Sequence, residues 1–521
     1  MGDKDRNISV RREGTEVIVE SVDVAGREDV AKLRKHAVGL GGVLFLTVTG
    51  AAPISAMLFN VPFSVGYGNG IGTPAGFMFA TAVLAIFSVG YVAMARKKTT
   101  AGGFYAFISH GLGRELGLGS GLASAIAYSV FEASLAGGFA YFLNLLLIDW
   151  FDVNVGWPVL ALVMVGIIAV LSYLDVSLSV AVLGVALILE VAALVIFAVG
   201  VFAQGGANGI PMAALNPANA FKDLPANAAT GLAAGAAGIG LFFAFWSWVG
   251  FEMAPNYGEE SKDPKTIVPR AMYISVIGLG IFYTLVSWAS IAGYSTFDAA
   301  ALQAQSDPAN YFLVPAQALI GGWLKEAMSV LIVTGSFACG MAFHNTAARY
   351  FYALGREGLI PRVFGKTHPR YHSPHTASVL QSVIAALIVI AFAVISGTDD
   401  PTSQAYLQLY GLMAAMGVIT ILFIQALCSL AIAVYFFRHH EAEVHLWKTI
   451  IAPIISIVGQ LYVLYLALTN MEFLGAGYAF ANWLVWIDLA IFVLGLLYAF
   501  YLKSRRIDTY ATIGRMIQEG L

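Results

Sequence analysis

The chemistry of this chain is concentrated where a charged side chain interrupts an apolar segment. Glu252 lies two residues after Gly250, in a run that begins with apolar residues at Phe242. A carboxylate and a glycine break are both unfavourable in the core of a bilayer, because neither the charge nor the freed backbone groups find water there. Together they predict a site where a membrane segment handles a polar cargo or a proton. We expect the residues around the break to contact the cargo: Trp246, Ser247, Trp248, Val249 and Gly250.

A second interruption lies nearer the beginning of the chain, in the run Thr49, Gly50, Ala51, Ala52 and Pro53. Proline has no backbone N–H and clashes with the preceding turn, and glycine tolerates unusual dihedrals, so backbone groups in this run leave the helical hydrogen-bond ladder. The N-terminal end of a half-helix carries bare N–H groups and a partial positive charge, which attract a carboxylate. We therefore predict that these five residues bind the cargo through their backbone.

Four acidic residues lie within apolar segments in which we expect no Lys or Arg: Glu132, Glu190, Glu252 and Asp488. Acids in such segments face a cavity, a proton path or a neighbouring helix. We expect Glu252 to gain and lose a proton. Glu190 either carries a proton or, with Ser336 and backbone carbonyls of the first segment, binds a sodium ion, since hard cations take oxygen ligands. Glu132 is a candidate for contact with a cationic cargo, and Asp488 is expected to bond a neighbouring helix.

Composition sets the class of protein that must position these residues. Of 521 residues, 59% are hydrophobic and 11% are charged, which excludes a soluble globular protein and indicates a polytopic helical membrane protein. The two cysteines offer no disulfide framework, and the histidines and cysteines lack the spacing of a metal site. We expect no metal, no cofactor, no nucleic-acid partner and no enzymatic activity.

Twelve apolar runs are long enough to cross a bilayer: 38–60, 73–95, 119–148, 157–173, 177–203, 232–255, 270–293, 320–350, 375–396, 405–437, 447–469 and 481–502.

The positions of the basic residues predict the orientation in the membrane. Loops and tails on one side hold 26 of the 28 Lys and Arg residues, and only Lys222 and Lys325 lie on the other side. Because cytoplasmic flanks retain positive charge, the tails 1–36 and 503–521 are both predicted to be cytoplasmic. The first tail is polar and has no apolar run like that of a signal peptide. We expect a multi-pass protein of the cell membrane, and the sequence leaves its oligomeric state open.

Several motifs together resemble those of the amino acid, polyamine and organocation transporters. They lie at 101–105, 245–252, 259–265, 267–271, 348–361, 368–370 and 373–374. The resemblance covers nearly the whole chain. It implies an all-α, leucine-transporter-like fold with two inverted repeats of five helices, at 37–203 and 204–437, followed by two further helices at 438–502. The breaks in spans one and six then belong to corresponding helices of the two repeats.

The resemblance also implies roles for single residues. In the family, unwound backbone at 49–53 holds the carboxylate and amino groups of the substrate. Here the run Gly-Ala-Ala-Pro replaces the usual Gly-Ser-Gly-Ile, so a hydroxyl is missing and the proline cannot donate. In the arginine and agmatine antiporters, a tryptophan at the position of Trp246 stacks over the substrate, and an acid at the position of Glu252 takes part in proton sensing. Glu190 lies where some relatives carry a lysine in place of a sodium ion.

From these residues we predict a secondary active transporter that moves amino acids by alternating access. Proton-coupled symport or exchange is the preferred mechanism, and sodium-coupled symport is the alternative. An α-amino acid matches both the helix ends and the acids, whereas a polyamine or a cationic amino acid would pair with Glu132 and Glu252. A channel or a membrane receptor fits less well, because the two broken helices are unlike and the chain has no repeated ring of carbonyls or charges.

Overall fold

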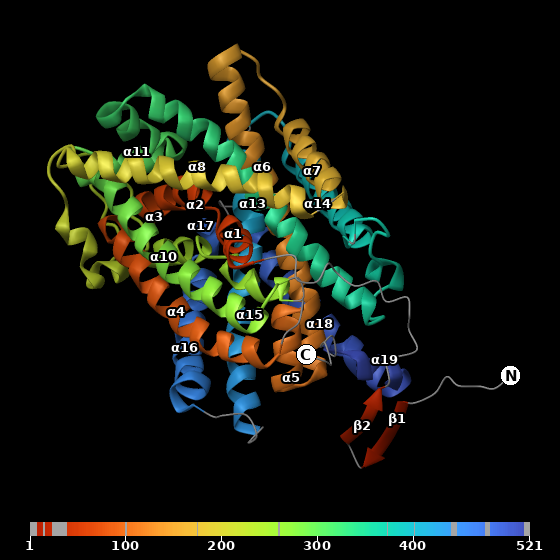
Figure 1. Ribbon diagram of the computed structural model, residues 1–521. Coiled ribbons are helices and arrows are strands. Elements are labelled where there is room, and N and C mark those ends of the chain that lie inside the picture. Colours follow the sequence, from red (N-terminus) through yellow and green to blue (C-terminus); the bar gives the residue numbers. More distant parts are fainter. Residues whose placement is uncertain are drawn as a thin grey trace.

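A bundle of helices forms the bulk of the molecule (Figure 1). The computed structural model describes residues 8–13, 16–22, 39–98, 102–174, 176–258, 261–371, 373–400, 402–438, 445–474 and 480–514. Within these ranges, twelve helical spans are long and apolar enough to cross a membrane. The prediction of twelve spans is therefore confirmed, although several helices extend beyond the predicted ends.

The spans are built from the following helices, in which η marks 3-10 and π-helical segments. Span one comprises α1 (Leu40–Ala51), α2 (Pro53–Ser55), η1 (Ala56–Asn60) and α3 (Val61–Tyr67), and span two comprises η2 (Gly70–Gly72) and α4 (Thr73–Lys97). Spans three to six comprise α6 (Arg114–Phe151), α7 (Trp157–Leu174), α8 (Val176–Ala203), and α9 (Ala237–Trp246) with η5 (Phe251–Tyr257). Spans seven to twelve comprise α10 (Pro264–Ala292), α13 (Gly322–Arg356), α14 (His375–Ser396), η9 (Thr402–Leu412) with α15 (Met413–Arg438), η10 (Leu446–Ile451) with α16 (Ala452–Thr469), and α18 (Ala481–Arg505).

Short elements connect the spans or, in the case of α19, follow the last one. They are α5 (Gly103–Leu112), η3 (Met212–Leu215), η4 (Pro217–Phe221), α11 (Phe297–Ser306), η6 (Pro308–Asn310), α12 (Leu313–Pro315), η7 (Ala316–Ile320), η8 (Arg362–Gly365), α17 (Met471–Leu474) and α19 (Ile507–Thr512). The all-α prediction holds for the membrane part, but not for the polar tail, where β1 (Ile8–Glu13) and β2 (Glu16–Val22) form an antiparallel hairpin outside the bundle (Figure 1). Both strands contain β-branched residues, which favour extended backbone.

Burial separates core spans from peripheral ones. In the most apolar window of each span, 67% to 100% of the residues are buried in spans one, three, six, eight and ten, against 22% to 33% in spans nine, eleven and twelve. The peripheral helices expose large apolar side chains, such as Trp483 and Trp486 of α18. Such side chains are stable next to lipid. The broken spans one and six are therefore among the five core spans, and α6 and α13, also core helices, pack along much of their length.

Candidate functional site

The first span is interrupted at Ala52. Helix α1 ends at Ala51, and Ala52 adopts a left-handed conformation with φ 40° before Pro53 opens α2. Proline suits the first position of a helix because the missing N–H has no helical partner there. The break predicted in this run is confirmed, but Gly50 remains helical and the residue that turns the chain is an alanine.

The sixth span is interrupted at Gly250. Helix α9 ends at Trp246, a turn follows, and Gly250 has φ 119° before η5 begins at Phe251. A Cβ placed on Gly250 would lie 2.4 Å from the carbonyl carbon of Gly50 and 2.8 Å from the nitrogen of Ala51. Only glycine fits both the backbone conformation and this close approach. The two breaks therefore touch through their backbones.

Side chains from neighbouring helices bond the backbone groups that the first break frees. The Tyr283 hydroxyl of α10 donates to the carbonyl oxygen of Ala51 at 3.0 Å, and the Cys339 Sγ of α13 lies 3.4 Å from the carbonyl oxygen of Gly50. Within the described part of the chain, the buried hydroxyls of Thr49 and Ser55 have no hydrogen-bond partner. A buried polar atom without a partner is costly, so these hydroxyls are suited to a polar ligand at the break.

Glu252 bonds the break in its own span. Its carboxylate accepts a hydrogen bond from the N–H of Gly250 at 3.0 Å and another from the Tyr128 hydroxyl of α6 at 2.9 Å. The side chain is buried, and the Tyr91 hydroxyl of α4 bonds the Glu252 carbonyl oxygen at 3.3 Å. The predicted acid therefore lies beside the glycine break, with neutral donors for both carboxylate oxygens.

Glu190 and Ser336 lie near the first break, on α8 and α13. The Glu190 carboxylate faces the backbone N–H of Ile54, which is the first donor of the half-helix that follows Pro53. A Cβ placed on Gly335 would lie 2.9 Å from Glu190 Oε1, so α8 and α13 meet closely here. The Ser336 hydroxyl donates to the carbonyl oxygen of Ile332 in its own helix at 2.7 Å. The structure brings Glu190 to the break, and the Ser336 hydroxyl donates its hydrogen within α13 and keeps its oxygen lone pairs.

The residues at the end of α9 and in the turn before Gly250 face two directions. Trp246 stacks on Tyr410 of η9, with ring centroids 5.0 Å apart, and Ser247 accepts a hydrogen bond from the Asn60 amide of η1 at 3.0 Å. Trp248 instead packs edge-on against Tyr283, with centroids 5.0 Å apart. The structure therefore groups Trp246 and Ser247 with spans one and ten, and Trp248 with span seven.

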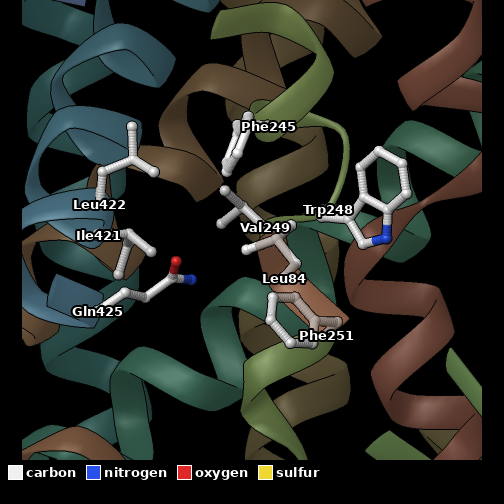
Figure 2. A pocket seen from close by; sticks show the side chains of 8 residues that line it. All are labelled: Leu84, Phe245, Trp248, Val249, Phe251, Ile421, Leu422 and Gln425. Carbon is white, nitrogen blue, oxygen red and sulfur yellow. The ribbon is translucent and has the colours of Figure 1, made fainter. Parts of the chain in front are cut away.

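A small cavity lies on the side of the sixth span that faces α4 and α15. Figure 2 shows its lining residues, which are Leu84, Phe245, Trp248, Val249, Phe251, Ile421, Leu422 and Gln425. The volume is about 10 Å³, close to the minimum for one water molecule. The amide of Gln425 is the most polar group in this lining. An amino acid cannot enter this cavity in the present conformation.

Glu132 lies apart from both breaks, between α6, α13 and α14. Its Oε2 atom is 2.9 Å from Nδ1 of His344 and accepts a hydrogen bond from the Gln381 amide at 2.7 Å. The other imidazole nitrogen of His344 lies 2.8 Å from the hydroxyl of Ser378. Both Glu132 and His344 have no exposed side-chain surface. The carboxylate that was predicted to meet a cationic cargo is thus directed at a histidine.

The expectation that the spans contain no Lys or Arg is wrong, and among the basic residues in the described helices Arg349 is deeply buried. Arg349 lies inside α13, which continues to Arg356, and only 1% of its surface is exposed. Its guanidinium lies over the ring of Tyr257, 4.5 Å from the centroid, and donates to the carbonyl oxygen of Asn345 at 3.0 Å. The aromatic face and the backbone carbonyl offset the cost of burying this charge. The acid predicted in span twelve, Asp488, is partly buried on α18.

Sequence reasoning missed the partners of the predicted residues: Asn60, Tyr128, Tyr283, His344 and Tyr410. Each is a polar side chain in a mostly apolar run, and each bonds a residue that is at least 124 positions away. Asn60, two residues before Pro62, was the clearest signal, because an amide inside an apolar span needs a bonding partner.

Comparison with known proteins identifies the family. A family model described as amino acid permease matches residues 39–502. The chain is 29% identical over 161 residues to the low-affinity putrescine importer PlaP of Escherichia coli (strain K12), a match that covers 29% of this chain and 33% of that protein. It is 24% identical over 367 residues to the branched-chain amino acid permease BcaP of Lactococcus lactis, which covers 67% of this chain and 75% of the permease.

A plant relative extends the range of these similarities. The vacuolar cationic amino acid transporter 8 of Arabidopsis thaliana is 26% identical over 146 residues, which covers 28% of this chain and 23% of that transporter. The matches thus span about a third or less of the length of the putrescine importer and the plant transporter. The family model, in contrast, covers the entire membrane part. The chain belongs to the amino acid permease family, within the amino acid, polyamine and organocation superfamily.

Proposed function

We propose that the protein is a secondary active transporter that moves amino acids across the cell membrane by alternating access. The cargo is held at the breaks of spans one and six, by 49–53 and 246–250. The observation that carries this proposal is the contact of the Gly250 backbone with the Gly50–Ala51 peptide, beside the unpartnered hydroxyls of Thr49 and Ser55. Two broken helices that meet in the core offer backbone donors and acceptors to a zwitterion.

The topology of this proposal follows the sequence. Residues 37–203 and 204–437 form two inverted repeats of five helices, each opening with a broken helix. Spans eleven and twelve follow in 438–502. Both termini face the cytoplasm in this proposal, and the distribution of basic residues supports this orientation. The half-helices α2 and η1 then lie toward the outer surface, and η5 lies toward the cytoplasm.

The coupling ion of this proposal is the proton, and Glu252 carries it. Its carboxylate bonds only neutral donors, Gly250 and Tyr128. Protonation removes the charge and so weakens the hydrogen bond that the carboxyl group accepts from the N–H of Gly250 at the break. Glu190, which faces the N–H of Ile54 at the first break, is the alternative proton carrier. Sodium is the alternative ion, because the Ser336 hydroxyl donates to Ile332 and keeps oxygen lone pairs that can coordinate a cation.

The proposal is tested with purified protein in proteoliposomes. Labelled leucine, lysine, arginine and putrescine are each measured in counterflow, with and without a pH gradient and with potassium in place of sodium. We expect counterflow of at least one amino acid and accumulation that follows the pH gradient. No exchange of any amino acid or amine would remove the transport proposal.

Two acid variants locate the coupling site. In Glu252→Gln we expect counterflow to continue, while accumulation driven by the pH gradient falls at least about tenfold, since a neutral amide cannot carry the proton. Glu190→Gln is the matched variant at the other break. If Glu252→Gln still accumulates cargo to the wild-type level and Glu190→Gln does not, the proton carrier is Glu190.

Transport of a polyamine or cationic amino acid is a second candidate. Carboxylates of the protein already face the freed N–H groups at both breaks, Glu190 at Ile54 and Glu252 at Gly250. A cargo without its own carboxylate is compatible with this arrangement. Competition by putrescine but not by leucine would favour this candidate. Loss of only cationic transport in Glu132→Gln would add support, since His344 and Gln381 bond Oε2 of Glu132 and its buried Oε1 has no partner among the described residues.

A further inference from the structure

A single amide side chain connects spans one, six and ten. The Asn60 Nδ2 atom donates to Ser247 Oγ at 3.0 Å, and the Tyr410 hydroxyl donates to Asn60 Oδ1 at 3.2 Å. Asn60 lies at the end of η1, Ser247 in the turn after α9, and Tyr410 in η9. All three residues are at least 95% buried. The polar atoms of one side chain therefore join three helices that are far apart in sequence.

The hydrogen-bond pattern fixes which way the amide points. The Ser247 hydroxyl donates to the carbonyl oxygen of Phe243 at 2.8 Å, so its oxygen is left to accept. Only the NH₂ end of Asn60 can donate to it, which directs the carbonyl end of the amide to the Tyr410 hydroxyl. The Asn60 amide therefore donates to Ser247 and accepts from Tyr410. An aspartate at this position cannot donate to Ser247, and a leucine can form neither hydrogen bond.

Aromatic rings surround this amide. Phe59 packs on Tyr410 with ring centroids 4.5 Å apart, and Trp246 stacks on the same tyrosine at 5.0 Å. Phe63 stacks on Phe243 at 5.0 Å. Hydrogen bonds in such a dry layer are strong, and breaking them without water leaves costly unpaired groups. The layer can therefore separate only if water enters and hydrates the amide.

Both segments that meet at Asn60 and Tyr410 are π-helical. They are η1 (Ala56–Asn60) and η9 (Thr402–Leu412). Pro62 follows η1 closely and lacks the N–H that would bond the carbonyl of Leu58, which explains the wide turn at this place. A π-helical turn is uncommon and is found frequently at functional sites. Because two such turns face each other here, we infer that this layer has a functional role beyond packing.

We propose that Asn60 is a positioning residue that latches the outer gate. Its two hydrogen bonds hold span one against spans six and ten, and this closes the path from the outer surface to the breaks. The latch rests on the alternating access proposed above. When the cargo path opens outward, water replaces Ser247 and Tyr410 as the bonding partners of Asn60, and the Trp246–Tyr410 stack separates.

Cys339 provides a native reporter for this gate. Its thiol is buried and lies 3.4 Å from the Gly50 carbonyl oxygen, at the first break and below the aromatic layer. The other cysteine, Cys428, is also buried and is replaced by serine for the experiment. A membrane-impermeant thiol reagent is then applied to vesicles, either from the side of the chain termini or from the opposite side. The rate of Cys339 modification measures how often each path is open.

We expect Asn60→Leu to raise the modification rate from the side opposite the termini roughly tenfold, since both hydrogen bonds of the latch are lost. Tyr410→Phe removes one bond and is expected to raise the rate about threefold. The matched control is Ser88→Ala, because the buried Ser88 hydroxyl bonds only Leu84 of its own helix. Its rate is expected to stay at the wild-type value.

Three outcomes overturn the latch: wild-type rates in Asn60→Leu and Tyr410→Phe, equal acceleration in Ser88→Ala, or acceleration only from the side of the termini. If Asn60→Leu fails to fold, as judged by size-exclusion chromatography, Tyr410→Phe decides, since it deletes a single hydroxyl. The measurement needs no cargo. If the protein exchanges cargo but the variants label Cys339 at the wild-type rate, only the latch is rejected. If the variants label Cys339 faster but no amino acid or amine is exchanged, only the proposed transport is rejected.

Discussion

The two helix breaks differ in what stabilises them. In span one, the turn is made by Ala52, and the freed groups are bonded by side chains of α8, α10 and α13. In span six, the turn is made by Gly250, and its N–H is bonded by Glu252, two residues further along the same span. Side chains of other helices thus stabilise the first break, and a side chain of its own span stabilises the second.

This difference assigns different tasks to the two breaks. The bonds to the Gly50 and Ala51 carbonyls come from a thiol and a phenol, which remain neutral over the physiological pH range. The bond to the N–H of Gly250 comes from a carboxylate that changes its acceptor capacity when it is protonated. We infer that the first break is the fixed half of the site and the second is the half that responds to protons.

The largest difference between the two breaks is expected when the glycine at each break is replaced by alanine. Gly250→Ala places a Cβ 2.4 Å from the Gly50 carbonyl carbon at φ 119°, whereas in Gly50→Ala the nearest atom is the flexible Met253 Sδ at 3.0 Å. We expect Gly250→Ala to lose roughly 3 kcal/mol or more of stability, and Gly50→Ala about 1 kcal/mol.

Thermal unfolding of the purified proteins and counterflow measure both effects. Gly250→Ala is expected to show no counterflow, and Gly50→Ala to retain most of it. Equal stability of the two variants would mean that the close contact between the breaks does not exist.

A smaller effect is expected from removing one hydroxyl at each break. Tyr128→Phe deletes a donor to the Glu252 carboxylate, and Tyr283→Phe deletes the donor to the Ala51 carbonyl. Each change removes one hydrogen bond of about 1 kcal/mol, so we expect exchange to slow about fivefold in each variant. Only Tyr128→Phe is expected to alter the pH profile of exchange, because only its partner titrates. An altered profile in Tyr283→Phe alone would reverse the assignment of the two breaks.

The smallest effect is expected from Ser336→Ala. The Ser336 hydroxyl bonds Ile332 of its own helix, so its loss should change stability by less than about 0.5 kcal/mol and exchange by less than about twofold. The rate of exchange in sodium and in potassium buffer checks this. A sodium-dependent wild type that loses this dependence in Ser336→Ala would instead place a sodium ion at the first break.

The sequence predicts those features of the molecule that depend on residues close together in the chain. Spans follow from the length of apolar runs, and the breaks follow from Pro53 and Gly250, whose backbone chemistry acts within a few residues. The turn at Ala52 was not predictable from residue type, because alanine favours the right-handed helix. Its left-handed conformation depends on Pro53 after it and on Tyr283, which bonds the Ala51 carbonyl.

Long-range partners explain what the sequence does not predict. The role of Glu132 depends on His344 and Gln381, which lie 212 and 249 residues away. The acid alone indicates a buried carboxylate and leaves open whether it meets a cargo, a proton or a histidine. Arg349 falls at the end of the predicted span 320–350, and the ring of Tyr257 that makes its burial tolerable is visible only in three dimensions.

Ala52 makes the first break a source of stored energy. A left-handed alanine costs about 1 kcal/mol relative to a helical one. Ala52 keeps this unfavourable conformation as long as the Tyr283 hydroxyl and the Gly250 backbone remain in contact with the first break. In the alternating access proposed above, movement of the sixth span away from this contact lets the first span gain free energy by relaxing its backbone. Protonation at one break can thus be followed by spontaneous motion at the other, without a second proton.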